Sequence, residues 1–385
     1  MKNELRIGLS LSGGGYRAAA FHLGTMQKLH EMGLLKDVDV ISTISGGSIT
    51  GAAWCLFDGD YPEFHGWMKE KIRTKNIIRE ILFSRSFLQL GIFFILFLGA
   101  AIWLLFTAWA PLSFVVLALM ISLLLKYQFY IFPISKDVEK AYDKFLYEGK
   151  TLSHLKKFPE LAIGSSNLAT GRPFTFSGRK MADSTYSKKP LIRFKHEDFP
   201  VARAVMASSC VPFAFTPLHI DKKYFENEAD ALRVHPLLVD GGVYDNQGIQ
   251  KITQHKSSYR CDVIISSDAG GPLSEAISFR NTITLLVRTV DVFMYRIKTM
   301  QMVEHVYQNV MQNERPIAYY SLGWEISKLI PGFINNMVES LVLPEVMAAH
   351  QLMPQWIASP RTYEKEIQRH LELSGLRCGI FKKPF

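Results

Sequence analysis

The stretch Val38-Asp-Val-Ile-Ser-Thr-Ile-Ser-Gly-Gly-Ser-Ile-Thr-Gly51 decides the fold of this chain. An apolar run rich in β-branched residues ends at Ile44, and small residues begin at Ser45 and lead into a helical pattern. A serine at such a strand-to-helix turn projects from the sheet, as in a nucleophile elbow of the Gly-x-Ser-x-Gly type. Thr43 stands where that pattern has its first glycine. Taken alone, the stretch is equally compatible with Ser45 as a simple helix N-cap.

A glycine loop precedes this stretch. Residues Leu5 to Leu11 have the pattern of a buried strand, and Ser12-Gly-Gly-Gly-Tyr-Arg17 follows before a helix expected from Tyr16 to Met32. The outward-pointing amides of such a loop bind an anion, either a phosphate or the oxyanion of acyl transfer. A phosphate site requires a P-loop lysine or a G-x-G-x-x-G pattern, and neither occurs in this register. A plain glycine turn that lets strand and helix approach closely stays open as an alternative.

The bulk composition bounds the class of protein. The 385 residues suffice for one large α/β domain with an insertion, or for two domains. A formal charge of +9 favours anionic partners, either nucleic acid or an anionic membrane leaflet. Residues Leu5 to Leu11 are too short for the apolar core of a signal peptide, so none is expected. The scattered cysteines have no C-x-x-C spacing, which predicts reduced thiols without a metal site or disulfide framework: Cys55, Cys210, Cys261 and Cys378.

A long apolar segment favours the membrane over nucleic acid. From Phe87 to Leu125 no residue is charged, and one span needs about 20 apolar residues, so the segment is long enough for two. Pro111, near its midpoint, breaks a continuous helix and predicts a tight turn between two spans. A re-entrant hairpin and a buried helical pair in a soluble core are the alternatives. Basic residues on both flanks place both ends on the cytoplasmic face: Lys69, Lys71, Arg73, Lys75, Arg79 and Arg85 before the segment, and Lys126, Lys136 and Lys140 after it.

The order strand, glycine loop, helix, strand, elbow, helix predicts an α/β fold with a parallel sheet and helices on both faces. The expected organisation is a catalytic domain in two parts, 1–85 and 134–322, a hairpin at 86–133 and a C-terminal helical extension at 323–385. Further strands are expected at Glu160 to Asn167, Gly171 to Phe176, Leu237 to Asp240, Cys261 to Ser267 and Ile317 to Ser321, and helices at Pro200 to Ser209, Thr282 to Val310 and Tyr363 to Gly375.

Three features are expected at strand carboxyl ends of this sheet, the edge where ligands of open α/β sheets collect: the glycine loop, Ser45 and Asp240. Serine hydrolysis needs a nucleophile, a base and donors for the oxyanion. Ser45, Asp240 and the amides around Gly13 to Gly15 fill these roles. Ser45 precedes the apolar insertion and Asp240 follows it, so a chain that brings them together crosses the bilayer an even number of times between them.

The motifs Gly13-Gly-Gly-Tyr-Arg17, Thr43-Ile-Ser-Gly-Gly47 and Asp240-Gly-Gly242, in this order, resemble those of the patatin-like phospholipases, and Ala207-Ser-Ser-Cys-Val-Pro212 is similar to another recurring segment of that family. The resemblance runs from about Arg6 to the near flank of the hairpin and again from Leu161 to about Ser321. It implies a three-layer αβα sandwich that hydrolyses acyl esters of phospholipids or lysophospholipids with a Ser-Asp dyad and no metal or organic cofactor.

On this resemblance, Ser45 attacks the acyl carbonyl and Asp240 is the base. The oxyanion is then held by the amides of Gly13, Gly14, Gly15 and Gly46. Arg17 steadies the glycine loop or meets a lipid phosphate. Thr43 departs from the family pattern and leaves open how closely strand and helix approach at the elbow.

Several residues compete for the role of base. His22 and His235 lie nearest the motifs in the sequence, and His22 falls within the first helix, where a buried histidine with satisfied partners is the usual case. Asp245 is expected in a turn and Asp268 as a helix cap. The main hypothesis is therefore a membrane-anchored lipid hydrolase, with a catalytically silent membrane scaffold on the same fold as its rival.

Overall fold

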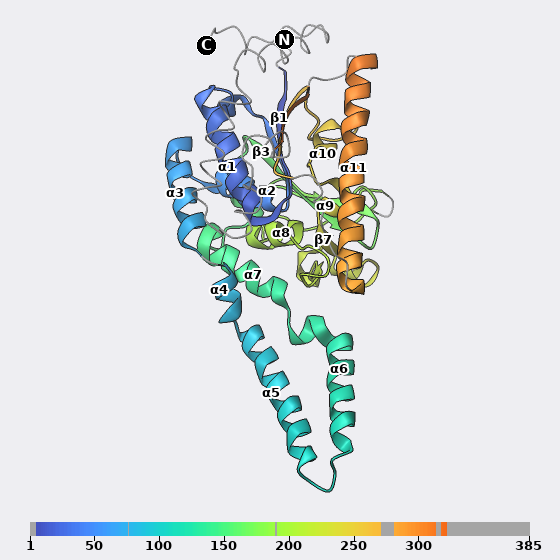
Figure 1. Ribbon diagram of the computed structural model, residues 1–385. Coiled ribbons are helices and arrows are strands. Elements are labelled where there is room, and N and C mark those ends of the chain that lie inside the picture. Colours follow the sequence, from blue (N-terminus) through green and yellow to red (C-terminus); the bar gives the residue numbers. More distant parts are fainter. Residues whose placement is uncertain (1–4, 76, 189–190, 271–280, 313–316, 322–385) are drawn as a thin grey trace.

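The computed structural model describes residues 5–75, 77–188, 191–270, 281–312 and 317–321 (Figure 1). The expected C-terminal extension, with its helix at Tyr363 to Gly375 and with Cys378, lies outside these residues. Within them, the strands and helices match most of the ranges expected from the sequence to within two or three residues.

The main domain is built on one mixed sheet whose main strand order is β5-β4-β3-β2-β1-β8-β9. From β3 to β9 the neighbouring strands are parallel, whereas β4 and β5 form an antiparallel edge. The bounds are β1 Ile7–Leu11, β2 Val40–Ile44, β3 Glu160–Asn167, β4 Arg172–Phe176, β5 Met181–Ala182, β6 Leu218–His219, β7 Leu237–Asp240, β8 Val263–Asp268 and β9 Ile317–Ser321.

Helices cover both faces of the sheet, as Figure 1 shows. One face carries α1 Gly15–Glu31, α2 Gly46–Leu56, α3 Tyr61–Thr74 and α8 Val201–Ser208, and the other carries α9 Gly242–Asp245, α10 Gln250–Thr253 and α11 Thr282–Gln312. Alternate residues of a strand serve the two sides, so Ile41 belongs to the large core under α1 and α2, and Val40 to a smaller core that includes Ile252 of α10. The expected three-layer α/β class is confirmed.

The short 3₁₀ and π turns are η1 Leu35–Asp37, η2 Asp143–Tyr147, η3 Leu152–His154, η4 Lys222–Tyr224 and η5 Glu228–Leu232.

The strand that carries Asp240 corrects one expectation. β7 is antiparallel to β3 and does not belong to the parallel set. β2 and β7 both pair with β3: Ile44 lies opposite Gly164 and Asp240 opposite Ser165. The two strands therefore run toward each other along β3 and end at adjacent residues of it. This head-on arrangement brings Ser45 and Asp240 together. The two residues do not meet as neighbours along one edge of a parallel sheet, as the sequence had suggested.

The apolar segment forms two helices, α5 Arg85–Leu105 and α6 Leu112–Ile131, with Pro111 at the N-cap of α6. Both are long and apolar enough to cross a membrane and are almost entirely exposed, so the alternative of a helical pair buried in a soluble core is wrong. They leave and rejoin the domain through α4 Ile77–Leu82 and α7 Ile134–Tyr142, which contact each other.

The hairpin projects from the end of the domain toward which β1 runs (Figure 1). The glycine loop and the elbow follow the carboxyl ends of β1 and β2 and so lie at this same end. The candidate site is thus on the hairpin side of the domain.

Candidate active site

Ser45 occupies a strained turn between β2 and α2. Its φ of 49° and ψ of −120° lie where side-chain-bearing residues are rare, a conformation that costs about 1–3 kcal/mol and recurs at functional sites. The side chain makes no hydrogen bond that caps α2, so Ser45 is not a conventional N-cap. Its backbone N–H donates to Ser208 Oγ at 2.8 Å, and only 4% of the residue is exposed.

The glycines after Ser45 let α2 and the glycine loop touch. A Cβ at Gly46 would lie 1.9 Å from the carbonyl oxygen of Gly15, and a Cβ at Gly47 would lie 2.3 Å from that of Leu11. The Gly47 N–H donates to Ser12 O at 3.1 Å. The first turns of α1 and α2 therefore begin side by side, next to Ser45.

The amides of the glycine loop are not equivalent. Gly13 N–H donates to Asn246 O at 2.8 Å, which corrects the expectation that it donates to an oxyanion. Gly14 and Gly15 have positive φ, are exposed, and begin α1, where helical amides have no partner within the helix. Gly46 stands in the same position at the start of α2. Gly14, Gly15 and Gly46 therefore remain the candidate oxyanion donors.

The structure accounts for Thr43. In the usual elbow, a glycine at this position makes room for the following helix; here the room is supplied by Gly51 of α2, whose added Cβ would lie 2.5 Å from Thr43 Cγ2. Thr43 Oγ1 accepts a hydrogen bond from Ser48 at 3.0 Å, so its hydroxyl is satisfied although the residue is fully buried. Strand and helix approach closely without the glycine, because the small residue is on the helix.

Asp240 is buried, with 3% of the residue exposed. Burial raises the pKa of its carboxyl to about 6, while hydrogen bonds from the Ser45 side chain and the Gly242 amide act in the opposite direction. The Gly242 N–H donates to Asp240 Oδ1 at 2.7 Å. At neutral pH the group is mainly ionised and is within reach of the Ser45 hydroxyl, which suits a base.

Neither His22 nor His235 is placed to act as the base. His22 is buried, and both ring nitrogens have partners: Nδ1 contacts Ser267 Oγ at 2.8 Å and Nε2 contacts Ser12 O at 2.9 Å. Burial lowers the pKa of His22 to about 4, so it is neutral and supports the glycine loop. His235 is exposed at the beginning of β7, the opposite end of that strand from Asp240.

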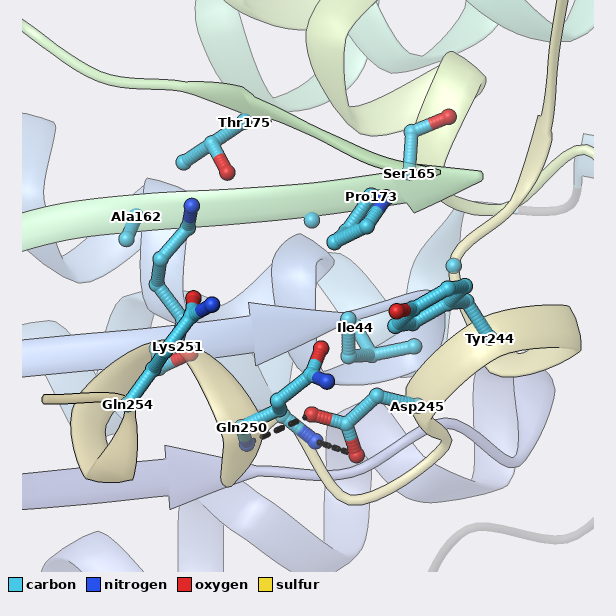
Figure 2. A pocket seen from close by; sticks show the side chains of 14 residues that line it. Ile44, Ala162, Ser165, Pro173, Thr175, Tyr244, Asp245, Gln250, Lys251 and Gln254 are labelled. Carbon is cyan, nitrogen blue, oxygen red and sulfur yellow. Dashed lines mark hydrogen bonds between the residues drawn. The ribbon is translucent and has the colours of Figure 1, made fainter. Parts of the chain in front are cut away.

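Asp245 fulfils its expected role as a turn residue. Its carboxylate accepts from the backbone amides of Gln247, Gly248 and Gln250, the last at 2.8 Å, and burial raises its pKa. Figure 2 shows it beside Ile44 and Gln250 in a small cavity. With about 30 Å³ for solvent, the cavity holds a few water molecules and lies on the face of the sheet opposite α2.

Asp268 pairs with Lys298 of α11, with Asp268 Oδ2 and Lys298 Nζ 2.5 Å apart, and also accepts from the Gly270 N–H. The segment after Gly270, which the expected helix cap concerns, lies outside the described residues. One turn before Lys298, Met294 Cε lies 2.9 Å from the position of an added Cβ at Gly242, beside Asp240. α11 thus covers the site from the far face of the sheet. Arg17 is exposed, and within the described part of the chain no hydrogen bond or ion pair joins it to the glycine loop.

Two residues of the site were not predicted. Ser208, at the end of α8, and Asn246, whose carbonyl holds Gly13, both act through contacts between distant segments. The serine lies within the segment Ala207 to Pro212, so the resemblance of that segment was a usable signal. Among the described residues, no group of three His, Cys, Asp or Glu side chains could hold a metal ion. The three described cysteines, Cys55, Cys210 and Cys261, are free and buried.

The chain aligns to several solved structures at low similarity. It aligns to VipD from Legionella pneumophila (15% identity, 74% of this chain and 52% of that one, TM-score 0.31) and to human GIVD cytosolic phospholipase A2 (14% identity, 69% and 45%, TM-score 0.43). It also aligns to the complex of SpcU with ExoU from Pseudomonas aeruginosa (13% identity, 96% and 71%, TM-score 0.26). The chain spans about half the length of the first two.

Comparison with curated protein sequences gave no match. The sequence model of the patatin-like phospholipases, in contrast, matches residues 9–250, which is more than half of the chain and includes the glycine loop, Ser45 and Asp240. The chain therefore belongs to the patatin-like phospholipase family, whose members hydrolyse lipid acyl esters.

Proposed function

We propose that this protein is a membrane-anchored serine acyl hydrolase that cleaves fatty acyl esters of phospholipids or lysophospholipids with Ser45 and Asp240. The observation that carries the proposal is the meeting of β2 and β7 on β3, which sets a serine in a strained turn against a buried carboxylate. Neither residue needs a metal for this chemistry.

The reaction follows from the geometry. As Ser45 Oγ forms a bond to the acyl carbon, its proton passes to Asp240 and the carbonyl electrons move onto the oxygen. That oxyanion accepts hydrogen bonds from the amides of Gly14, Gly15 and Gly46, assisted by the positive N-terminal ends of α1 and α2. Collapse of the intermediate expels the alcohol, which takes the proton from Asp240. Water then attacks the acyl-enzyme by the same steps.

The hairpin supports membrane anchoring. At about 1.5 Å per residue, the 21 residues of α5 extend about 30 Å, the thickness of the hydrocarbon core, which favours full crossing over a re-entrant dip. Large aromatic side chains are exposed at both ends, Trp103 and Trp109 near the turn and Tyr127 and Tyr130 near the domain, as is typical of membrane interfaces. The basic residues of both flanks favour a catalytic domain on the cytoplasmic face.

Arg17 is proposed as a contact for the lipid phosphate. It is exposed in the first turn of α1, next to the exposed glycines, and no described residue pairs with it. Arg17→Ala is expected to raise KM about tenfold for a phospholipid and to leave hydrolysis of a neutral short-chain ester unchanged. Equal losses on both substrates would assign Arg17 to the glycine loop instead.

The rival hypothesis, a catalytically silent scaffold, had Thr43 as its only hint. Thr43 does not favour it, because Gly51 provides the room that the missing glycine would have provided. The test is incubation of purified protein, in detergent micelles, with a mixed lipid extract and identification of the released products. Free fatty acid is expected with the wild type and not with Ser45→Ala; equal release by both proteins would refute the proposal, and acylated acceptors in place of fatty acid would indicate acyl transfer.

A further inference from the structure

The strained backbone of Ser45 is held by a hydrogen bond from outside the elbow. Because φ is positive, the turn is not maintained by the ordinary preferences of the residue. The N–H of Ser45 precedes the helix and has no helical partner, and its acceptor is Ser208 Oγ at 2.8 Å. This bond joins residues that lie on either side of the inserted hairpin in the sequence.

Ser208 is a junction of three segments. Its hydroxyl has one proton, which it donates to the carbonyl oxygen of Gly164 in β3, so toward Ser45 it acts as an acceptor. Its own carbonyl accepts from the Gly241 N–H at 3.1 Å, next to Asp240. The residue is fully buried. Through its side chain and its carbonyl, Ser208 therefore connects the end of α8 to Ser45, to β3 and to the segment that follows Asp240.

A second pair of hydroxyls flanks this junction. Ser48 Oγ lies 2.9 Å from Ser208 Oγ and donates to Thr43 Oγ1 at 3.0 Å. Thr43 immediately precedes Ile44 and the elbow, and Gly51 leaves room for its methyl group. The residue that departs from the family pattern therefore belongs to the same buried network as Ser208.

We propose that Ser208 and Thr43 are positioning residues of the Ser45–Asp240 dyad. Ser208 maintains the positive φ of Ser45 and fixes the elbow against the Asp240 segment. Thr43 accepts the Ser48 proton and so holds the Ser48 side chain in place beside Ser208. Neither residue touches the substrate. The kinetic consequence rests on the proposed hydrolase function, whereas the structural consequence, the backbone conformation of Ser45, does not.

The first test is Ser208→Ala in the full chain, in detergent micelles. Without the acceptor, the buried N–H of Ser45 is left unsatisfied, so the turn is expected to relax and the Ser45 hydroxyl to move away from Asp240. On a soluble ester, kcat is expected to fall roughly 10- to 100-fold with KM unchanged, since small misplacements of a reacting group have effects of this size. The matched control is Ser209→Ala, because that hydroxyl bonds to Val205 O and to Tyr142 and not to Ser45.

The second test separates hydroxyl from shape at Thr43. Thr43→Val keeps the branched shape and removes the hydroxyl, and it is expected to lower kcat about tenfold. Thr43→Ser keeps the hydroxyl and is expected to retain most of the wild-type kcat. This pair also carries the test if Ser208→Ala does not fold. Equal kcat in Thr43→Val and wild type, or a Thr43→Ser variant as impaired as Thr43→Val, would overturn the role of Thr43.

The structural readout is the φ angle of Ser45 in a crystal structure of Ser208→Ala, with Thr43→Val as the substitute. A shift of φ to a negative value is expected. A φ that stays near the wild-type value, a kcat within twofold of wild type, or an equal loss in Ser209→Ala would each overturn the role of Ser208. If the wild type cleaves no ester, the proposed function fails, and the φ angle still decides whether Ser208 holds the turn.

Discussion

The elbow and the hairpin depart from the usual distribution of polar and apolar side chains in opposite directions. Around the elbow, polar residues are buried: Ser45 and Asp240 are 4% and 3% exposed. Along the hairpin, apolar residues face outward, with Ile95 71% and Phe114 73% exposed. Each departure costs free energy in a water-soluble protein unless something compensates for it.

The compensation differs between the two regions. Around the elbow it comes from the protein: Ser208 Oγ accepts from the Ser45 N–H, and the Gly242 N–H donates to Asp240. On the hairpin no described residue covers the outer faces of α5 and α6, so the compensation we propose is lipid. The elbow is thus organised to position polar groups, whereas the hairpin, on our proposal, holds the domain at a membrane. Experiments that remove one kind of compensation at a time sharpen this difference.

The largest effect is expected for Asp240→Asn. It removes the base, so kcat on a soluble ester is expected to fall by roughly 10³-fold or more, within the range for loss of an essential acid–base residue. Stability at pH 8 is expected to rise, because the folded pKa of about 6 lies above the ordinary 3.8. The ionised carboxylate therefore destabilises the fold above pH 6, by on the order of 3 kcal/mol.

Thermal unfolding of wild type and Asp240→Asn at pH 8 and pH 4 measures the stability difference, and it should shrink at pH 4, where the wild-type carboxyl is protonated. Asp245→Asn serves as a control, because that carboxylate supports a turn and faces away from the elbow. A variant of Asp240 that remains fully active would contradict its role.

The next effect concerns location. Replacing residues 88–131 with a short Gly-Ser linker is feasible because the rings of Phe87 and Phe132 lie 6.3 Å apart at the base of the hairpin. The variant is expected to move from the membrane to the soluble fraction and to keep hydrolysis of a soluble ester. Fractionation after washes with salt and carbonate measures this, with the full-length chain as the reference.

Hydrolysis of vesicle phospholipid by the linker variant should drop at least tenfold, because the site is no longer held at the bilayer. A linker variant that stays bound after carbonate would show that the domain itself binds the membrane.

A smaller effect is expected from pH. Asp240 acts as a base only when ionised, and its folded pKa is about 6, so kcat/KM should rise about tenfold between pH 5 and pH 7 and then level off. The rate profile on a neutral soluble ester measures this without titration of the substrate. A profile with its midpoint near pH 4 would indicate that Asp240 is hydrated in the working enzyme.

The smallest effect is expected at the contact of Thr43 with Gly51. Gly51→Ala adds a Cβ 2.5 Å from Thr43 Cγ2 and is expected to destabilise the fold by about 1–3 kcal/mol in chemical denaturation. Thr43→Gly combined with Gly51→Ala should recover much of that loss, since the double variant restores the spacing with the small residue on the strand. Additive losses would show that the two residues do not compensate for each other.

The parts of the structure that follow from local pattern were predictable. The strand before Ser45, the glycine loop and the break at Pro111 all depend on residues next to one another, and the structure has them where the sequence placed them. The motif order also pointed to Ser45 and Asp240 as the candidate dyad.

The parts that depend on distant contacts were not. The antiparallel direction of β7 depends on its pairing with β3, some seventy residues earlier, and a four-residue strand contains no signal of its direction. The bond of Gly13 to Asn246 and the pairing of Asp268 with Lys298 are likewise contacts between segments. Thr43 looked like a departure because its compensation, Gly51, lies eight residues away on another element.

The central claim is that Ser45 is an activated nucleophile in a site held at the membrane. The most direct measurement is labelling of the full-length protein in phospholipid vesicles with a fluorophosphonate probe, followed by intact mass and peptide mapping. The account predicts one adduct, on Ser45, which forms at least a hundredfold more slowly in Asp240→Asn. Labelling at another serine, or equal rates in wild type and Asp240→Asn, would contradict it.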